Sequence, residues 1–310
     1  MVGNCIKYPV LSFPRKWESR ISFATLDSRF RLPAQAGGND NMQVLPIKTR
    51  ILLPPKDNLS EVLDDSLPKL GERDVVVVTS KIVSIGEGRC VPLGTPAQKR
   101  LLIKQEADYL ARFKGARRSV FSVKGHTVVG SAGIDESNAN GHWILWPKDP
   151  FRSAKGLWSY LREKHQVSQL GIIITDSTSP PMRLGCTGIS IGFFGIHPVL
   201  RYVGKTDIFG RTFKFERANL VDGIAAAAVV ALGEGDEQMP IAVVRDIPNL
   251  RFCSYTTSHE LLIRPKEDMY YPLFKPLYEQ SKKKRSLLSP LSKGKKKRGL
   301  PVHAYRRRFP

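Results

Sequence analysis

Runs of consecutive apolar residues recur along the chain, a pattern typical of strands that are buried on both faces of a sheet. The ranges of these runs are 43–47 (QVLPI), 74–78 (DVVVV), 126–130 (HTVVG), 170–176 (LGIIITD), 186–196 (CTGISIGFFGI) and 240–246 (PIAVVRD). The run that starts at residue 186 contains three spaced glycines, which indicate bulges or the close approach of another backbone. The sequence therefore predicts a mostly buried sheet.

Four other segments carry apolar residues at helical spacing, with polar residues between them. Their ranges are 57–70 (DNLSEVLDDSLPKL), 95–113 (TPAQKRLLIKQEADYLARF), 149–165 (DPFRSAKGLWSYLREKH) and 218–237 (ANLVDGIAAAAVVALGEGDE). Thr95 is a candidate N-cap with Pro96 at the first helical position, and Gly233 is expected to stop the last helix. Because helices and strands are mixed without regular alternation, we expect an α+β fold of mixed sheets with packed helices.

The two ends of the chain differ from the part between them. The formal net charge is +21, and residues 281–310 hold twelve Lys and Arg but no Asp or Glu. Like charges in a block repel and stay solvated, so we interpret 281–310 as a disordered basic tail. Residues 1–41 lack strand or helix periodicity and resemble translated intergenic repeat DNA. We interpret them as a non-native or disordered extension before a start at Met42, and 42–280 as the folded domain.

Composition narrows the class of protein further. No apolar run approaches the length of a membrane span, and the four cysteines include no CxxC pair, as expected of a reduced, cytoplasmic protein. A net charge this high also fits a nucleic-acid-binding protein, which is the alternative from a different functional class. We expect any such binding to be non-specific and to depend on the basic tail.

Three acidic residues lie at the ends of predicted elements. Asp135 follows one predicted strand, Asp176 closes another, and Glu234 follows the small-residue helix. A hard divalent cation takes several oxygen ligands, and Ser177 adds a hydroxyl beside Asp176. Glycines around Glu234 would let backbone N–H groups face a phosphate. Each acid alone is also compatible with a solvated loop; together they predict a metal and phosphate site, without the GxxxxGK[ST] or GxGxxG patterns of common nucleotide folds.

Six further segments occur in a defined order along the chain: TSKIVSIGEGR (79–89), SAGIDESN (131–138), KDPFRSA (148–154), IITDS (173–177), VGKTDIFGR (203–211) and LGEGDEQMPIAVVRD (232–246). Their order and intervals resemble those of one known family, the coenzyme F420-0:L-glutamate ligases (F420:γ-glutamyl ligases). The segments are similar to the family's "SKAEGR", "NAGIDxSN", "DPDxSA", "ITDTxGRPxRxG", "GxxDxxGRxL" and "GEGxxGxPxxVVRG". The resemblance covers roughly residues 42–246.

This resemblance implies a cytoplasmic α+β enzyme that forms an intertwined homodimer. It implies an acid–amino-acid ligase that uses GTP, two divalent cations (Mg²⁺ or Mn²⁺) and possibly K⁺ to couple L-glutamate to a deazaflavin precursor, coenzyme F420-0. By the matching motifs, the catalytic residues are Asp135 and Asp176, and the metal ligands are Asp135, Asp176, Ser177 and Glu234. The nucleotide-binding residues implied are Ser80, Lys81, Asn138, Leu232, Gly233, Glu234, Gly235, Asp236 and Met239. We expect Arg183, Lys205 and Arg211 to bind the anionic substrates.

Three positions depart from the family pattern. Ile85 replaces a lysine, Pro180 replaces an arginine, and Gly223 stands where glutamate is usual. The metal ligands are therefore retained better than the groups expected around the substrates. This pattern fits the same phosphoryl chemistry with a changed acceptor, and it also fits a relative with weakened activity. A ligase of the same fold that uses another carboxylate and amine is the alternative within the enzyme class.

Overall fold

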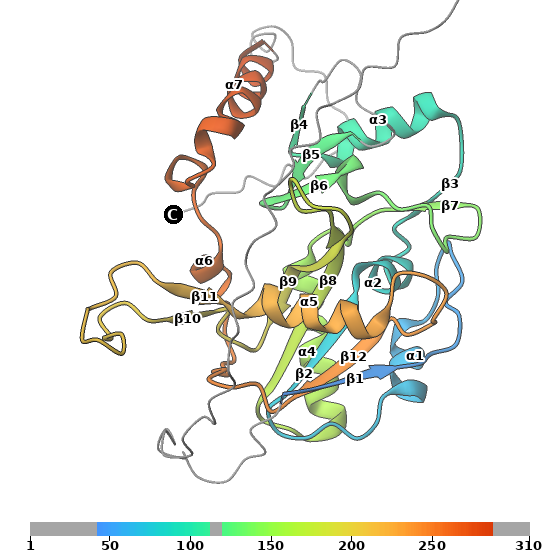
Figure 1. Ribbon diagram of the computed structural model, residues 1–310. Coiled ribbons are helices and arrows are strands. Elements are labelled where there is room, and N and C mark those ends of the chain that lie inside the picture. Colours follow the sequence, from blue (N-terminus) through green and yellow to red (C-terminus); the bar gives the residue numbers. More distant parts are fainter. Residues whose placement is uncertain (1–41, 112–119, 288–310) are drawn as a thin grey trace, which may run out of the picture. The chain divides into compact units, whose positions relative to one another are not determined.

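The structure, a computed structural model, describes residues 42–111 and 120–287 (Figure 1). The predicted N-terminal extension, 1–41, lies outside these residues, as do residues 288–310 of the predicted basic tail. Among the residues described, none of the helices combines the length and apolar character needed to traverse a lipid bilayer.

A five-stranded sheet forms the centre of the described part. Its strand order is β1 (Gln43–Ile47), β12 (Ile241–Arg245), β2 (Asp74–Thr79), β8 (Leu170–Thr178) and β9 (Thr187–Phe194). The pair β2–β8 is parallel, and the other neighbours are antiparallel. All five strands were predicted from their apolar runs, and the mixed sheet confirms the expected α+β class. The homodimer stays a prediction.

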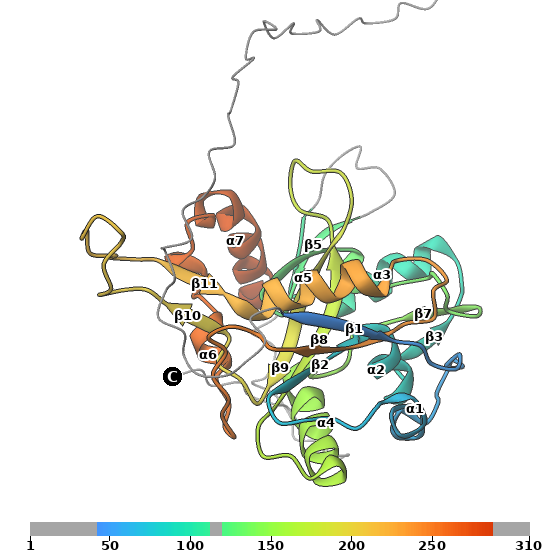
Figure 2. The ribbon, with the colours of Figure 1, turned by 60° about the horizontal axis from the view of Figure 1, so that its bottom comes forward.

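Helices cover both faces of this sheet, which explains why β2 is apolar at four successive positions. Helix α5 (Leu220–Leu232) packs on one face, against Val75 and Val77. Helices α1 (Leu59–Ser66), α2 (Ser80–Gly86) and α4 (Pro150–His165) pack on the other, against Val76 and Val78. Figure 2 shows α4 and α5 on opposite sides of the strands. Since alternate side chains of a strand point to opposite faces, all four valines are fully buried.

Helix α3 (Pro96–Glu106) begins as predicted but ends early. The Thr95 side chain accepts a hydrogen bond from the backbone N–H of Gln98, and the Gln98 side chain accepts one from the backbone N–H of Thr95. These two reciprocal bonds form a capping box. The predicted extension of the helix to residue 113 is wrong. Strand β4 (Tyr109–Leu110) follows instead, because this segment pairs with β5 (Phe121–Lys124).

Smaller elements surround the central sheet. Strands β4, β5 and β6 (Thr127–Gly130) form one small sheet. The remaining elements are β3 (Cys90–Pro92), η1 (Ser131–Gly133), β7 (His142–Ile144), β10 (Val199–Arg201), β11 (Arg217–Asn219), α6 (Ser258–Leu261), η2 (Pro265–Glu267) and α7 (Tyr271–Leu287). Helix α7 packs on the small sheet through Tyr278 and Tyr109, whose rings meet edge to face with centroids 4.6 Å apart. The expected domain boundary at residue 280 therefore falls inside a helix.

Close packing between β9 and α5 gives a first prediction. A side chain at Gly188 would place its Cβ 2.4 Å from the carbonyl oxygen of Ala225, whereas one at Gly156 in α4 would meet nothing within 4 Å. We expect Gly188→Val to lower the free energy of unfolding by about 1–3 kcal/mol through overpacking. We expect Gly156→Ala to raise it by about 0.5–1 kcal/mol. Urea unfolding of both variants measures this, and a Gly188→Val variant as stable as wild type would contradict the packing.

Candidate active site

Four segments that are distant in sequence meet at one edge of the central sheet. Strands β2 and β8 are parallel, with Thr79 opposite Thr175, so Ser80 and Asp176 follow at the same edge. Strand β12 runs antiparallel to β2, with Ile241 opposite Val78, so the glycine-rich loop before β12 reaches this edge as well. The fourth segment, 131–138, follows β6, and Thr178 ties β8 to β6 by a 2.9 Å hydrogen bond to the carbonyl of Val128.

Asp176 is the most buried acid of this edge. Its Oδ1 accepts a hydrogen bond from the Ser80 hydroxyl at 3.1 Å, and its Oδ2 accepts one from the Trp146 indole N–H. Within the described residues it pairs with no Lys, Arg or His. Burial raises the pKa of Asp176 to about 6, and the nearby charge of Asp135 adds to the rise. Asp176 is thus a carboxylate that lacks a cationic partner.

Asp135, in contrast, already pairs with a cation, the ammonium group of Lys81. Its Oδ2 lies 2.8 Å from the Nζ of Lys81, and its Oδ1 accepts hydrogen bonds from the backbone and hydroxyl of Ser137 at 2.8 and 2.9 Å. Burial raises the pKa of Asp135, but Lys81 and Ser137 outweigh that effect and hold it below its usual value. Lys81 also donates to the carbonyl of Ser137 at 2.8 Å, which fixes the turn after Asp135.

The glycine-rich loop is joined to the other segments by two contacts. The hydroxyl of Ser177 donates to Glu234 at 2.6 Å, and the side-chain amide of Asn138 donates to the carbonyl of Gly235 at 2.8 Å. Gly233 has a φ of +79°, a left-handed value that glycine adopts without strain. The predicted metal ligands and most of the predicted nucleotide-binding residues are therefore brought to one edge.

Three of the predicted nucleotide-binding residues make no side-chain hydrogen bond or ion pair with the other site residues in the described part of the chain. Leu232 is buried at the end of α5, and Met239 packs against the same apolar cluster, so the core holds both side chains. Their side chains therefore face the core rather than a nucleotide. Asp236 is exposed, and its side chain has no polar partner among the described residues.

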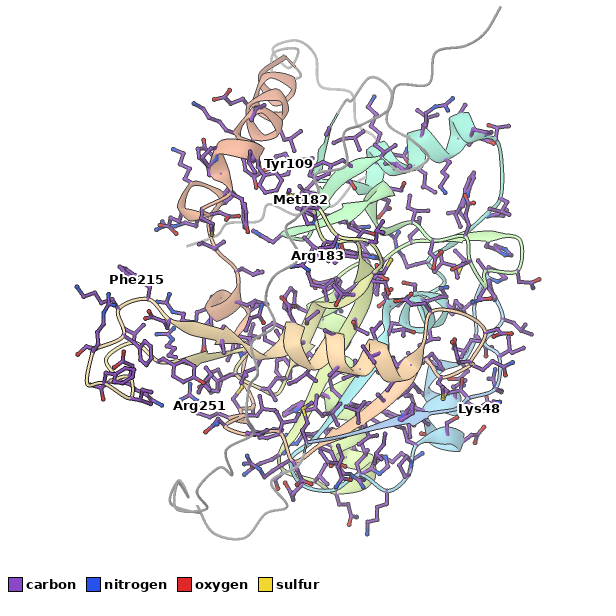
Figure 3. All side chains as sticks on the ribbon, viewed as in Figure 1. Lys48, Tyr109, Met182, Arg183, Phe215 and Arg251 are labelled. Atoms are coloured by element: carbon purple, nitrogen blue, oxygen red, sulfur yellow. The ribbon has the colours of Figure 1, made fainter. Side chains whose placement is uncertain are left out.

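The three predicted substrate-binding cations lie on two different loops. Arg183 is exposed on the β8–β9 loop, which continues from the strand that carries Asp176 (Figure 3). Lys205 and Arg211 lie on the exposed hairpin between β10 and β11, which projects from the central sheet. The backbone N–H of Arg211 donates to Asp207 at 2.8 Å, and the Nζ of Lys205 lies 5.6 Å from the centre of the Tyr202 ring. This chain alone does not bring these two residues to the sheet edge.

Sequence reasoning missed two residues of the site. Trp146 lies between the motif segments 131–138 and 148–154 and belongs to neither; it is 3% exposed and donates to Asp176. Ser137 was read only as part of the motif around Asp135. Its position two residues after an aspartate is the spacing of an Asx turn and could have indicated the contact. The Trp146 contact spans 30 residues, and no local pattern indicates it.

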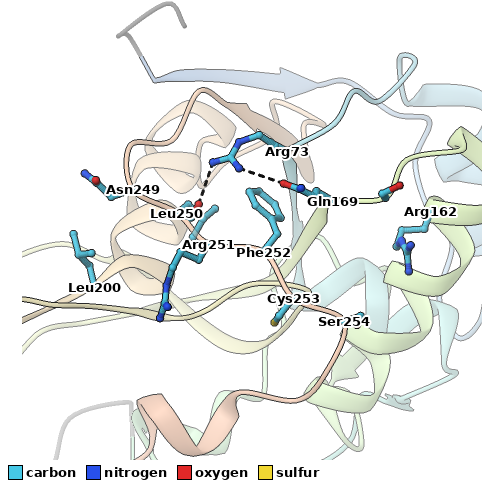
Figure 4. A pocket seen from close by; sticks show the side chains of 11 residues that line it. Arg73, Arg162, Gln169, Leu200, Asn249, Leu250, Arg251, Phe252, Cys253 and Ser254 are labelled. Carbon is cyan, nitrogen blue, oxygen red and sulfur yellow. Dashed lines mark hydrogen bonds between the residues drawn. The ribbon is translucent and has the colours of Figure 1, made fainter. Parts of the chain in front are cut away.

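One pocket of the described residues lies away from this edge. A cavity of about 750 Å³ lies near the start of β2 and β8, at the opposite end of these parallel strands (Figure 4). Arg73, Arg162 and Arg251 line it, and the Arg73 guanidinium donates to Gln169 and to the carbonyl of Leu250. None of the predicted site residues lines this pocket, so we do not assign it to the candidate active site.

The donor atoms at the edge suit divalent cations. Asp135, Asp176 and Glu234 offer carboxylate oxygens and Ser177 a hydroxyl, the hard ligands that Mg²⁺ and Mn²⁺ take. In residues 42–111 and 120–287, no group of three or more His, Cys, Asp or Glu is placed to hold a metal ion. A cage made of protein ligands alone is therefore not formed. One or two carboxylates with substrate phosphates are the usual arrangement for Mg²⁺, and the residues fit it.

The raised pKa of Asp176 predicts a pH dependence. Between its ordinary value of 3.8 and about 6, the folded protein binds more protons than the unfolded chain. The free energy of unfolding must then fall as pH rises through this window. In metal-free protein at pH 7.5, we expect Asp176→Asn to be more stable than wild type by about 1–3 kcal/mol, with little difference at pH 4. Urea unfolding with a chelator measures this, and an unchanged pH profile would contradict it.

Comparison with known proteins supports the family resemblance predicted from the motifs. Residues 46–246 match the family described as F420-0:Gamma-glutamyl ligase. A protein of Methanopyrus kandleri named coenzyme F420:L-glutamate ligase is 32% identical over 76% of this chain and 99% of its own length. Proteins of the same name from Methanosarcina mazei and Methanosarcina acetivorans are 32% and 33% identical, over 69% and 70% of this chain and 89% and 90% of their own lengths.

These matches run through every segment that meets at the sheet edge, from Ser80 to the loop before β12. The relatives are named as ligases, which agrees with the amide-forming class predicted from the motifs. The chain therefore belongs to the F420-0:Gamma-glutamyl ligase family.

Proposed function

We propose that the protein is a GTP-dependent ligase of the cytoplasm that couples L-glutamate to coenzyme F420-0 or a related acceptor. The observation that carries this proposal is the sheet edge where Asp135, Asp176 and the Ser177–Glu234 pair converge. The family membership supports the amide-forming chemistry, and the relatives' names support the acceptor. The choice of GTP rests on the family resemblance alone.

Asp135 and Asp176 would hold one divalent cation, and Ser177 and Glu234 a second; K⁺ could assist. Such cations, when bound, neutralise the charge that develops as a γ-phosphoryl group moves to a carboxylate. The displacement of Lys81 from Asp135 would free an ammonium group, 2.8 Å from the carboxylate in this structure, to contact the nucleotide's phosphates. Asp176, which pairs with neutral donors only, gains most from a nearby positive charge.

The loop between α5 and β12 would hold the nucleotide, mainly through its backbone. The tie from Asn138 to the carbonyl of Gly235 fixes the loop against the segment that carries Asp135. In this structure the N–H of Gly233 donates to the carbonyl of Val229 and that of Gly235 donates to the carboxylate of Glu237, at 2.8 Å. A phosphate oxygen would therefore take the place of the Glu237 carboxylate at Gly235. The hydroxyl of Ser80, held against Asp176, completes this side of the site.

The chemistry proposed is acyl activation. A carboxylate is a poor acylating agent until it carries a phosphoryl group, which makes its carbonyl carbon open to attack. The amine of L-glutamate would then attack that carbon, expel phosphate and form the amide. Arg183, on the exposed loop that continues from β8, would hold an anionic substrate.

Lys205 and Arg211 would reach the site only in a dimer. The hairpin that carries them exposes Ile208, Phe209 and Phe215 by 91, 89 and 79%. Exposed apolar side chains in such a group mark protein contacts, and the family resemblance supports a second copy as the partner. Light scattering should give the mass of two chains. A monomer with full activity would contradict this part of the proposal.

The test of the function is phosphate release from GTP under matched conditions. With Mn²⁺, L-glutamate and F420-0 all present, we expect release that stops when any component is omitted or a chelator is added. ATP, and other amines or carboxylates offered in turn, distinguish a changed nucleotide or acceptor. A rate of phosphate release that does not change when L-glutamate or any acceptor is added would contradict a ligase.

A further inference from the structure

Trp146 contacts one of the two aspartate segments directly. It follows β7, is 3% exposed, and donates its indole N–H to Oδ2 of Asp176. The other oxygen of Asp176 is held by Ser80, so two neutral donors fix the plane of the carboxylate. Each oxygen keeps a further lone pair for another ligand.

The same indole packs against the other segment. Gly133 has a φ of +71°, and a Cβ built on it would lie 2.2 Å from the indole nitrogen of Trp146. The backbone of the turn therefore lies against the edge of the ring that carries the N–H. Asp135 is only two residues further along this turn. One indole therefore contacts both the Asp176 carboxylate and the backbone turn that leads to Asp135.

A half-buried cluster of Arg89, Glu106 and Lys124 contacts Trp146. Nε of Arg89 donates to its carbonyl at 3.1 Å, and Nζ of Lys124 lies 5.5 Å from its ring centre. Both cations pair with Glu106, at 2.8 and 2.7 Å. Arg89 holds the backbone of Trp146 and Lys124 lies over the face of its ring, so the indole has little freedom to rotate.

We propose that Trp146 is a positioning residue that sets the separation of Asp135 and Asp176. The inference rests on the proposed function, since these aspartates matter together only if they serve one cation-dependent reaction. Removal of a group that orients ligands in this way typically lowers metal affinity or activity by about 10–100-fold.

The contact itself can be tested without metal. The chain has four tryptophans, so a ¹H–¹⁵N spectrum contains at most four indole signals. We expect Asp176→Asn to shift the signal assigned to Trp146 and to leave that of Trp158, which donates to the carbonyl of Leu170 at the far end of β8. Equal shifts for both signals, or no shift of the Trp146 signal, would overturn the contact.

The role is tested with Trp146→Phe, which keeps a ring and removes the donor. Its matched control is Trp143→Phe, because the Trp143 indole, 4% exposed, donates to the carboxylate of Glu136 at 2.5 Å, outside the predicted ligand set. Mn²⁺ affinity by electron paramagnetic resonance and steady-state GTP turnover are the readouts. For Trp146→Phe we expect a loss of about 10–100-fold in Mn²⁺ affinity and in kcat. The KM for glutamate should change less than about threefold, and the control should stay near wild type.

A second pair of variants guards against a folding defect in the first. Gly133→Ala would press on the indole nitrogen, whereas Gly125→Ala has a similarly positive φ of +56° but meets only the far edge of the ring, at 3.8 Å. We expect Gly133→Ala alone to reproduce the loss of Mn²⁺ affinity. Trp146→Phe and Gly133→Ala proteins that bind Mn²⁺ and turn over like their controls would overturn the inference and leave the function standing. A wild-type protein that neither binds Mn²⁺ nor turns over GTP would instead contradict the proposed function.

Discussion

Replacing Asp176 by asparagine is expected to reduce metal-dependent GTP turnover by about 1,000-fold or more. The side chain keeps its size and an acceptor oxygen for Ser80 or Trp146, but it loses the charge that a cation requires. Metal binding supplies several kcal/mol of charge stabilisation in phosphoryl transfer, and each 1.4 kcal/mol corresponds to a factor of ten. Phosphate release at saturating GTP and Mn²⁺ is the measurement.

Asp64 provides the control for this variant. It lies in α1, away from the sheet edge, and accepts a hydrogen bond from Tyr160 while pairing with Lys164. Asp64→Asn should turn over GTP at the wild-type rate. Because Asp176→Asn is expected to be more stable than wild type at neutral pH, lost turnover in that variant would not reflect unfolding. Turnover within about tenfold of wild type would remove Asp176 from the mechanism.

Asp135→Asn is the second substitution with a large expected effect. It removes a predicted metal ligand and leaves Lys81 without the carboxylate that lies 2.8 Å from its Nζ. We expect turnover to fall by about 100–1,000-fold, and Mn²⁺ affinity with it, because the remaining carboxylate must hold the cation with less protein charge. Isothermal titration with Mn²⁺, with and without GTP, measures the affinity directly.

The neighbouring residue offers a matched control. Glu136 also carries a carboxylate, but it pairs with Lys99 at 2.5 Å and faces Trp143 rather than the sheet edge. Glu136→Gln should therefore keep Mn²⁺ affinity and turnover within about threefold of wild type. If both variants lost turnover equally, the loss would come from the shared turn, and the assignment of Asp135 as a ligand would be wrong.

The motifs grouped the site residues, and the strand order explains why those residues lie at one edge. The apolar run 170–176 identified a buried strand ending in Asp176, and the valine run identified its neighbour. Once these two strands are parallel, their carboxyl ends must share an edge, so the Ser80–Asp176 contact follows from topology. The antiparallel placement of β12 was not predictable from its own sequence, yet it brings the loop with Glu234 to that edge.

Other features needed the three-dimensional structure. The helix expected to run to residue 113 ends at Glu106 because the following residues pair with β5, a partner supplied from further along the chain. The position of Trp146 against Asp176 depends on the packing of Gly133 and on the half-buried ion cluster around Glu106. Such contacts arise between segments that carry no joint pattern, so periodicity and spacing do not reveal them.

The placement of the substrate cations shows a similar limit. Motif order grouped Arg183 with Lys205 and Arg211, but the chain places the latter two on a projecting hairpin. A sequence gives the order of functional residues without saying whether they act within one chain. The apolar side chains of the hairpin are what support a second copy as the missing element.

The mass of the reaction product tests the central claim most directly. The full-length protein is incubated with GTP, Mn²⁺, L-glutamate and F420-0, beside the Asp176→Asn variant, and the acceptor is analysed by mass spectrometry. The account predicts that the acceptor gains the mass of at least one glutamyl residue with wild-type protein and gains none with the variant. An acceptor of unchanged mass with wild-type protein, or an equal gain with both proteins, would contradict it.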